Sequence, residues 1–178
     1  DGVSGIWVAE RVAAGWAEPE RLLLGRGPAL DGCPTYRPDE LWFCSARAGN
    51  WREVDIYLAD YRDGRLGRVR NAGRRLNAEH GAGEFHLSAD GQTLTFHADL
   101  PGGYGGLDLW QVQRQGQTWG QPRNLGPSVN SPRDETRPFV TSDGAALWYS
   151  GDSRLGYPGH ALYRSLRSLN PSPYMFYF

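Results

Sequence analysis

Long apolar segments are missing from this chain of 178 residues. No stretch approaches the roughly 20 apolar residues that a membrane-spanning helix needs, and no basic segment followed by an apolar one opens the sequence as a signal peptide does. We therefore expect a soluble chain without a transmembrane segment of its own.

An excess of charge of one sign is also missing, since the formal net charge is -1. Lysine is absent, so all 19 basic residues are arginines. A nearly neutral chain has no general attraction to nucleic acid or to an anionic membrane, and electrostatic binding must be local. We predict no nucleic-acid partner.

The motifs that commonly mark an active site are missing as well. The sequence has no GxSxG elbow and no phosphate-binding P-loop, and neither cysteine has a recognisable catalytic setting. No pair of carboxylates is singled out by its spacing as a glycosidase would require. The histidines show no zinc-binding spacing: His80, His86, His97 and His160. These absences predict that the chain is not an enzyme and holds no metal and no cofactor.

A short segment that recurs along the chain is the main feature that the sequence does contain. It reads RPDELWF at 37–43, SADGQTLTF at 88–96 and TSDGAALWY at 141–149. Its aspartates Asp39, Asp90 and Asp143 are separated by 51 and 53 residues. Because apolar and polar residues alternate on both sides of the aspartate, each copy predicts a β-hairpin with the aspartate in its turn.

Two further segments recur with the same period and in the same order. Copies of the first are GIWVAERV at 5–12, VDIYLADY at 54–61, LDLWQVQR at 107–114 and HALYRSLR at 160–167. Copies of the second are GWAEPERL at 15–22, RLGRVRNA at 65–72 and TWGQPRNL at 118–125. One order and one period for all three segments indicate an internal repeat of about 50 residues.

Each repeat predicts four short antiparallel strands, and such a unit buries both faces only by stacking on its neighbours. We therefore expect an all-β fold, a β-propeller of four-stranded antiparallel blades. About three and a half blades are present: a partial blade at 1–29, blades at 30–78 and 79–131, a partial blade at 132–167, and then an aromatic tail at 168–178. Because a closed ring needs about four blades or more, we expect either part of a larger ring or an open ring with edges covered by another chain.

Three stretches of the sequence resemble a known repeat. The segments LSADGQTLTF, GGYGGLDLW and TWGQPRNLGPSVNSPRDETRPFVTSDG resemble the TolB-like propeller repeat of bacterial envelope proteins, including those joined to OmpA-like peptidoglycan-binding domains. The resemblance covers about 5–167 and is strongest over 84–149. It implies a propeller and a periplasmic or envelope-associated location, but it implies a function only weakly because propellers host unrelated activities.

Repeated aromatic residues lie in the loops after the second strand of each blade, which we expect on one mouth of the propeller. These are Trp51, Tyr104 and Tyr157, at intervals of 53 residues. Flat amphipathic rings provide much contact energy, so they suit a protein partner or a carbohydrate. Packing of the rings between blades is the structural alternative.

Two aspartates precede the third strand of a blade. They are Asp55 and Asp108, and the last copy has His160 instead. A carboxylate beside a glycine-rich loop either accepts backbone N–H bonds or binds a cation. The resemblance favours the structural role, and the loss of the carboxylate in one copy argues against a symmetric metal site.

Arginines gather in the segment RDGRLGRVRNAGRR at 62–75, which includes Arg68, Arg70, Arg74 and Arg75. These four are candidates for a patch that binds phospholipid headgroups, an acidic protein or nucleic acid. A solvated outer strand, charged so that its edge does not pair, explains the same residues without a ligand.

The two cysteines, Cys33 and Cys44, flank one hairpin. If Pro38 and Asp39 form its two-residue turn, the cysteines face each other, and a disulfide is geometrically possible. An oxidising compartment would follow from such a bond. A bulge would shift the register and leave two buried free thiols instead.

The tail NPSPYMFYF at 170–178 interrupts the repeat and is strongly apolar, with Tyr174, Phe176 and Phe178. It either completes the last blade as an outer strand or docks on a neighbouring subunit or a membrane-associated protein.

Together these features predict a non-catalytic protein-interaction or scaffolding module of the bacterial cell envelope. The more detailed version is an extrinsic accessory subunit of a membrane-bound complex, with a protein partner at the tail and the arginines. Binding of a glycan or peptidoglycan fragment by the aromatic loops is one alternative. A glycosidase-like enzyme is another, which no motif supports.

Overall fold

The computed structural model describes residues 4–25, 29–152 and 159–167. Within these residues the regular structure is antiparallel strand, apart from one short π-helix, η1 (Arg75–Glu79). The predicted all-β fold is therefore confirmed.

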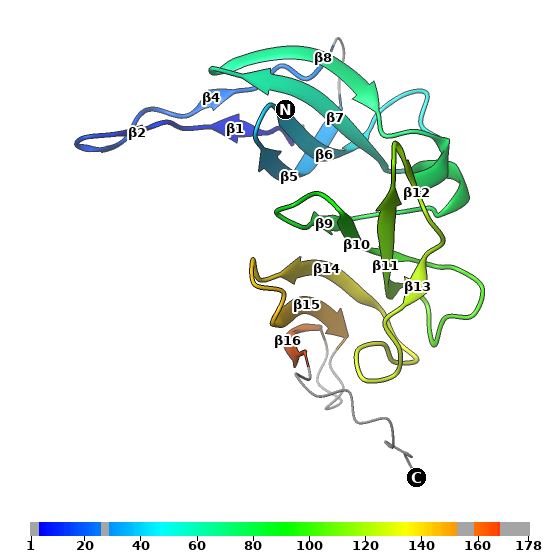
Figure 1. Cartoon of the computed structure of the whole chain (residues 1–178). Coiled ribbons are helices and arrows are strands. Elements are labelled where there is room, and N and C mark those ends of the chain that lie inside the picture. Colours follow the sequence, from blue (N-terminus) through cyan, green and yellow to red (C-terminus); the bar gives the residue numbers. More distant parts are fainter. Residues whose placement is uncertain (1–3, 26–28, 153–158, 168–178) are drawn as a thin grey trace.

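Three larger sheets follow one another in chain order, as propeller blades do (Figure 1). The first sheet contains β5 (Leu30–Arg37), β6 (Glu40–Ala46), β7 (Asp55–Arg62) and β8 (Arg65–Asn71). The second contains β9 (Phe85–Leu87), β10 (Thr93–Ala98) and β11 (Asp108–Gln115), and both β12 (Thr118–Trp119) and β13 (Arg123–Asn124) pair with β11. The third contains β14 (Glu135–Val140), β15 (Ala146–Asp152) and β16 (His160–Leu166).

The N-terminal part of the chain forms one long hairpin, which extends away from the first sheet in Figure 1. Its strands pair β1 with β4 and β2 with β3: β1 (Trp7–Val8), β2 (Arg11–Val12), β3 (Gly15–Trp16) and β4 (Glu20–Arg21). We call residues 7–21 the N-terminal hairpin. Its sequence repeats that of β7 and β8, so it corresponds to the last two strands of a blade.

Alternate side chains of β6 enter two different cores, because successive residues of a strand point to opposite faces of the sheet. Phe43 packs in a cluster with Ile6 and Leu24 on the side of the N-terminal hairpin. Trp42 and Cys44 point the other way and join the core between the first and second sheets. Neither face of this sheet is polar, which is why the sheet requires a neighbour on each side.

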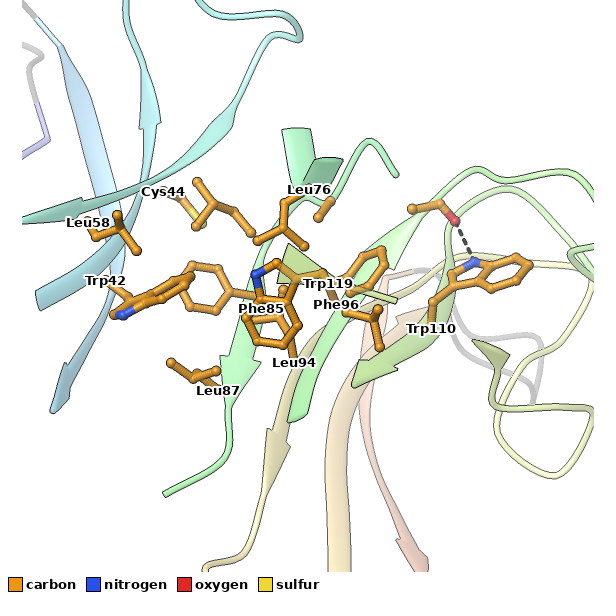
Figure 2. Packing of buried hydrophobic residues seen from close by; sticks show 14 residues of the cluster. Trp42, Cys44, Leu58, Leu76, Phe85, Leu87, Leu94, Phe96, Trp110 and Trp119 are labelled. Carbon is orange, nitrogen blue, oxygen red and sulfur yellow. Dashed lines mark hydrogen bonds between the residues drawn. The ribbon is translucent and has the colours of Figure 1, made fainter. Parts of the chain in front are cut away.

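The core between the first and second sheets is rich in aromatic rings (Figure 2). Trp42 meets Phe85 and Trp119 edge to face, with ring centroids 6.2 Å and 6.3 Å away. Trp110 is also buried, and its indole N–H donates to the carbonyl of Ala98 over 3.1 Å. Burial of such side chains stabilises the fold by about 1.5–3 kcal/mol each.

The other face of the second sheet packs on the third sheet. Leu109, the neighbour of Trp110 in β11, is fully buried there with Val129 and Tyr149. Tyr149 stacks on Tyr163 with ring centroids 5.4 Å apart, and its hydroxyl donates to the carbonyl of Val129 over 3.2 Å. Successive sheets thus share their cores in pairs.

The connection from the first sheet to the second contains η1, and residues of this helix and just after it bond the second sheet. Leu76 is completely buried in the core between the two sheets. Just after the helix, His80 Nε2 lies 3.0 Å from the carbonyl oxygen of Gly120, and Arg75 Nε donates to the carbonyl of Trp119 over 3.2 Å. The repeat pattern did not predict this helix, whose side chains contact both blades: Asn77 bonds Ile56 of the first sheet, and Arg75 bonds Trp119 of the second.

The first hairpin has the expected two-residue turn. Arg37 pairs with Glu40, so Pro38 and Asp39 form the turn, and Asp39 takes a positive φ of 69°. In the second hairpin Asp90 accepts hydrogen bonds from the Ser88 hydroxyl and the Gln92 N–H.

The third hairpin repeats this arrangement, since Asp143 accepts from the Thr141 hydroxyl and from the Ala145 N–H. The bonds from Ser88 and Thr141, followed by those from the backbone, hold the pKa values of Asp90 and Asp143 below the usual range.

Candidate functional site

Two loops at the same end of neighbouring sheets carry exposed aromatic rings. Trp51 lies in the loop between β6 and β7, and Tyr104 lies in the equivalent loop between β10 and β11. Their exposed fractions are 51% and 48%. We call these loops, 47–54 and 99–107, the aromatic mouth. About half of each side chain therefore faces solvent.

The buried carboxylate of Asp55 holds the first loop by its backbone. Its two oxygens accept the N–H groups of Trp51 and Arg52 at 3.1 Å and 3.2 Å. Asp108 holds the second loop through one oxygen, since its Oδ2 accepts the N–H of Tyr104 at 2.6 Å while its buried Oδ1 has no hydrogen-bond partner among the described residues. Asp55 and Asp108 therefore position the aromatic residues through structural hydrogen bonds.

Two asparagines connect Asp55 to the middle of its sheet. Asn71 donates to Asp55 Oδ2 over 2.9 Å, and Asn77 donates to Asn71 Oδ1 over 2.7 Å. Asn77 also donates to the carbonyl of Ile56 and accepts from its N–H, at 2.9 Å and 2.8 Å. This buried side chain bonds both backbone groups of Ile56, whose carbonyl also accepts the N–H of Ala72 over 2.8 Å.

The second sheet repeats the network. Asn124 donates to Asp108 Oδ2 over 2.8 Å, and Asn130 donates to Asn124 Oδ1 over 2.8 Å. Asn130 also bonds both backbone groups of Leu109, at 3.0 Å and 2.8 Å. Sequence reasoning found the aspartates and missed the asparagines, although both pairs of asparagines keep the interval of 53 residues.

The third aromatic residue of the predicted set, Tyr157, lies outside the described residues. The apolar tail with Tyr174, Phe176 and Phe178 lies outside them too. The structure therefore brings two of the predicted aromatic residues to one mouth.

A cleft opens at the opposite end of β10, between the second and third sheets. Its volume is about 970 Å³, and it is bordered by the turns 88–90 and 141–145. Gln111 and Arg123 line one wall. At its inner end His86 meets Phe139 edge to face, with ring centroids 5.1 Å apart. Sequence reasoning missed this cleft, because no motif marks the space between two sheets.

The predicted arginine patch is largely neutralised by its own neighbours. Arg70 forms ion pairs with Asp60 and Glu40, and the bond from Arg70 holds the pKa of Asp60 below its usual value. Arg74 and Arg75 both pair with Glu79.

Arg68, the remaining member of the predicted patch, is exposed on β8, the outermost strand of the first sheet. Three of the four predicted arginines therefore carry a local partner. This arrangement fits a charged outer edge better than a site for an anion.

Cys33 and Cys44 are free thiols in this structure. The turn has the register that would place them opposite each other, but a bulge between Gly32 and Thr35 shifts that register by one residue. Gly32 consequently stands opposite Cys44, and Cys33 occupies the bulge with a positive φ of 52°. The shift arises within the strand, so the turn sequence alone does not reveal it.

Metal-binding clusters of three or more histidine, cysteine or carboxylate side chains do not occur in the described part of the chain. Among the same residues, no helix has the length and apolar character needed to cross a membrane.

Comparison with protein-family models finds no match, and comparison with curated protein sequences finds none either. Among solved structures, a puromycin hydrolase matches with a TM-score of 0.49 and 18% identity, over 92% of this chain and 26% of that one. A putative TolB from Agrobacterium tumefaciens matches with a TM-score of 0.49 and 16% identity, over 90% of this chain and 56% of that one. A hypothetical selenium-binding protein from Sulfolobus tokodaii matches with a TM-score of 0.42 and 13% identity, over 78% of this chain and 36% of that one.

The prediction that the chain is not an enzyme is corrected by the first of these matches, which is a hydrolase. The absence of motifs concerns this chain alone, and one fold hosts both catalytic and other activities. The chain spans between 26% and 56% of the length of the matched structures. At these identities the chain is similar to them in its all-β fold, and the likeness extends no further.

Proposed function

We propose that the chain is a propeller-type interaction module that binds a protein partner at its aromatic mouth. The observation that carries the proposal is the pair of equivalent rings, Trp51 and Tyr104, which are half exposed although their backbones are held by buried carboxylates. Because the loop backbone is fixed and the aromatic side chain remains in solvent, the ring is free to contact a partner.

The energetics of binding support this use of the two rings. Aromatic side chains provide large contact areas at a low cost in conformational entropy, and they dominate many protein interfaces. Because hydrogen bonds to Asp55 and Asp108 fix the loops beforehand, less ordering is required when the partner arrives. The repeat places the two rings at corresponding points of adjacent blades, so a single partner surface meets both.

Glycan binding is the second candidate, and the same rings support it because sugars stack on exposed aromatic faces. The two functions differ in the ligand that the rings bind. Titration with soluble peptidoglycan fragments separates them, since the protein-partner proposal expects no saturable binding of these fragments. Saturable binding that Tyr104→Ala removes would support the glycan candidate instead.

The experiment for the protein partner is co-purification from envelope extracts, followed by affinity measurement with the partner so identified. We expect Trp51→Ala and Tyr104→Ala each to weaken binding about tenfold or more, which corresponds to about 1.4 kcal/mol or more. Trp16→Ala is the matched control, because Trp16 is 71% exposed on the N-terminal hairpin. Equal affinity of all three variants and the unmodified chain would contradict the proposed mouth.

We propose the bacterial cell envelope as the location of this module, with the chain acting as an extrinsic accessory subunit. The TolB-like repeat over 84–149 supports this location. Fractionation of cells tests it, and we expect the chain in the periplasmic fraction or on membranes from which a salt wash releases it. Recovery in the cytosol alone would contradict the location and leave the aromatic mouth unaffected.

A further inference from the structure

The first strands of the three sheets bring three chemically different side chains to equivalent positions. Cys33 in β5, Glu84 beside β9 and Arg137 in β14 each stand six residues before the turn aspartate of their hairpin. β9 lies between β5 and β14 in space. The three side chains therefore form a row across the inner edges of the sheets.

Two of these three positions have an unusual backbone. Cys33 and Arg137 both have a φ of 52°, and each lies at a shift in strand register. A positive φ is costly for a residue with a side chain, and bulges redirect side chains, often next to functional sites. Here the Arg137 guanidinium reaches Glu84, with Nε 3.4 Å from Oε2. The bulged Arg137 thus contacts the residue at the equivalent position of the second sheet.

The bulge in β5 leaves Cys33 next to Gly32, which stands opposite Cys44. Cys33 packs against the core between the first two sheets, of which Cys44 is a member, and the Cys44 thiol donates to the carbonyl of Gly83 over 3.9 Å. Cys44 is buried, with an exposed fraction of 4%, whereas Cys33 is only half-buried. An attacking molecule from solvent therefore meets the sulfur of Cys33 first.

The surroundings make the two thiols unequal. The neighbouring Cys44 thiol lowers the pKa of Cys33, burial and the charge of Glu84 oppose this effect, and Arg137 adds the smallest contribution, a lowering. The neighbouring Cys33 and burial raise the pKa of Cys44. A thiolate is the nucleophile in exchange reactions, so the greater exposure and the lowered pKa of Cys33 both favour it as the thiol that attacks first.

We propose that Cys33 and Cys44 form a redox-active dithiol that reacts with an external disulfide, with Cys33 as the attacking thiol and Cys44 as the resolving thiol. The Cys33 thiolate attacks one sulfur of the disulfide, forms a mixed disulfide and expels the other half as a thiolate. Cys44 then gives its proton to solvent and attacks the Cys33 sulfur, which breaks the mixed disulfide and expels the second half as a thiolate. The external disulfide gains the two electrons that the cysteine pair loses, and both expelled thiolates take up a proton from solvent and leave as thiols.

Arg137 and Glu84 are positioning residues in this scheme, because they act through the charge of Cys33. We expect Arg137→Gln to slow the reaction near neutral pH and to shift its pH profile to higher pH. Glu84→Gln is the matched variant with the opposite sign, and we expect it to shift the profile to lower pH. A purely structural ion pair would leave both profiles in place.

The test uses the full chain, reduced and then mixed with glutathione disulfide, with mass spectrometry as the readout. We expect the unmodified chain to lose two hydrogens, and dithiothreitol to restore them under native conditions. Cys44→Ser should accumulate one glutathione on Cys33, and Cys33→Ser should react about tenfold or more slowly. Circular dichroism confirms that each variant is folded.

A second arm replaces glutathione disulfide by the oxidised form of a thioredoxin-fold protein. Faster oxidation by this protein identifies a protein disulfide as the source, and faster oxidation by glutathione disulfide identifies a small molecule. The proposal is overturned if neither disulfide oxidises the chain, if the two serine variants react at equal rates, or if the Cys33–Cys44 bond resists dithiothreitol in the folded chain. None of these results depends on the aromatic mouth.

Discussion

The indole rings of Trp42 and Trp119 meet edge to face across the boundary between two sheets, with centroids 6.3 Å apart and planes at 89°. Trp42 comes from β6 in the first sheet and Trp119 from β12 at the outer edge of the second. Both are buried, with exposed fractions of 2% and 6%. Both rings are buried in the core that the two sheets share, so the pair links the stability of one blade to the presence of the next.

Replacement of Trp42 by alanine should therefore destabilise both sheets. We expect the free energy of unfolding to fall by about 3–5 kcal/mol, because the substitution removes a large buried ring and leaves a cavity between the sheets. Urea unfolding followed by circular dichroism measures the change. Trp51→Ala is the control, since its ring is half exposed, and it should change the stability by no more than about 0.5 kcal/mol. Similar losses for the two variants would contradict a shared core around Trp42.

Asn77→Ala tests the buried amide network. The substitution leaves the buried N–H of Ile56 without its partner, which costs about 1–3 kcal/mol, whereas the carbonyl of Ile56 keeps the bond from the Ala72 N–H. Asn130→Ala removes the corresponding bonds to Leu109, so we expect a loss of similar size. Thermal and urea unfolding measure both. A change below about 0.5 kcal/mol for either variant would show that water replaces the side chain.

Much of the fold was predictable from the sequence because repetition and alternation are properties of the residues themselves. The period of the turn aspartates Asp90 and Asp143 located the hairpins, and the repeat of four-stranded units indicated sheets that bury both faces only against their neighbours. The exposure of Trp51 and Tyr104 was not predictable, because a ring in a loop either packs or projects according to contacts that only the folded backbone defines.

The parts that could not be predicted depend on neighbouring blades. Cys33 leaves the expected register through a bulge that turns it toward the second sheet, and the two-residue turn of the same hairpin carries no sign of it. The cleft between the second and third sheets is lined by residues of two repeats, so no segment of one repeat marks it. Leu76 is buried in the core that the first and second sheets share, so the periodicity within its own repeat did not mark it as a core position.

Stability should decrease on mild acidification because of buried histidines. Burial lowers the pKa values of His80, His86 and His97 below the ordinary value of 6.5. As the pH falls below 6.5, the unfolded chain binds protons before the folded chain does, and the free energy of unfolding falls until the lower folded-state pKa is reached. Urea unfolding at a series of pH values from about 7 to 5 measures this slope.

His80→Gln separates one histidine from the others. Glutamine retains a donor for the carbonyl of Gly120, which lies 3.0 Å from His80 Nε2, but it does not titrate. We expect a shallower loss of stability in this pH range. The exposed carboxylates Asp90 and Asp143 have lowered pKa values, so their contributions are lost at lower pH than the histidine effect. An unchanged slope in His80→Gln would assign the effect to His86 and His97 alone.

The loop of Tyr104 leaves no room for a side chain at Gly105. A Cβ atom there would lie 2.5 Å from the carbonyl oxygen of Ser131 and 2.6 Å from that of Arg133, and both are backbone atoms that do not rotate away. We expect Gly105→Ala to lower the free energy of unfolding by about 1–3 kcal/mol and to weaken partner binding, since the displaced loop carries the ring of Tyr104 with it. Gly32→Ala is the matched control, because nothing lies within 4 Å of its Cβ position, and it should change stability by at most about 0.5 kcal/mol. Full stability of Gly105→Ala together with unchanged binding would mean that the connection at 131–133 yields to the new methyl group, and that the contact between the two blades does not position the aromatic mouth.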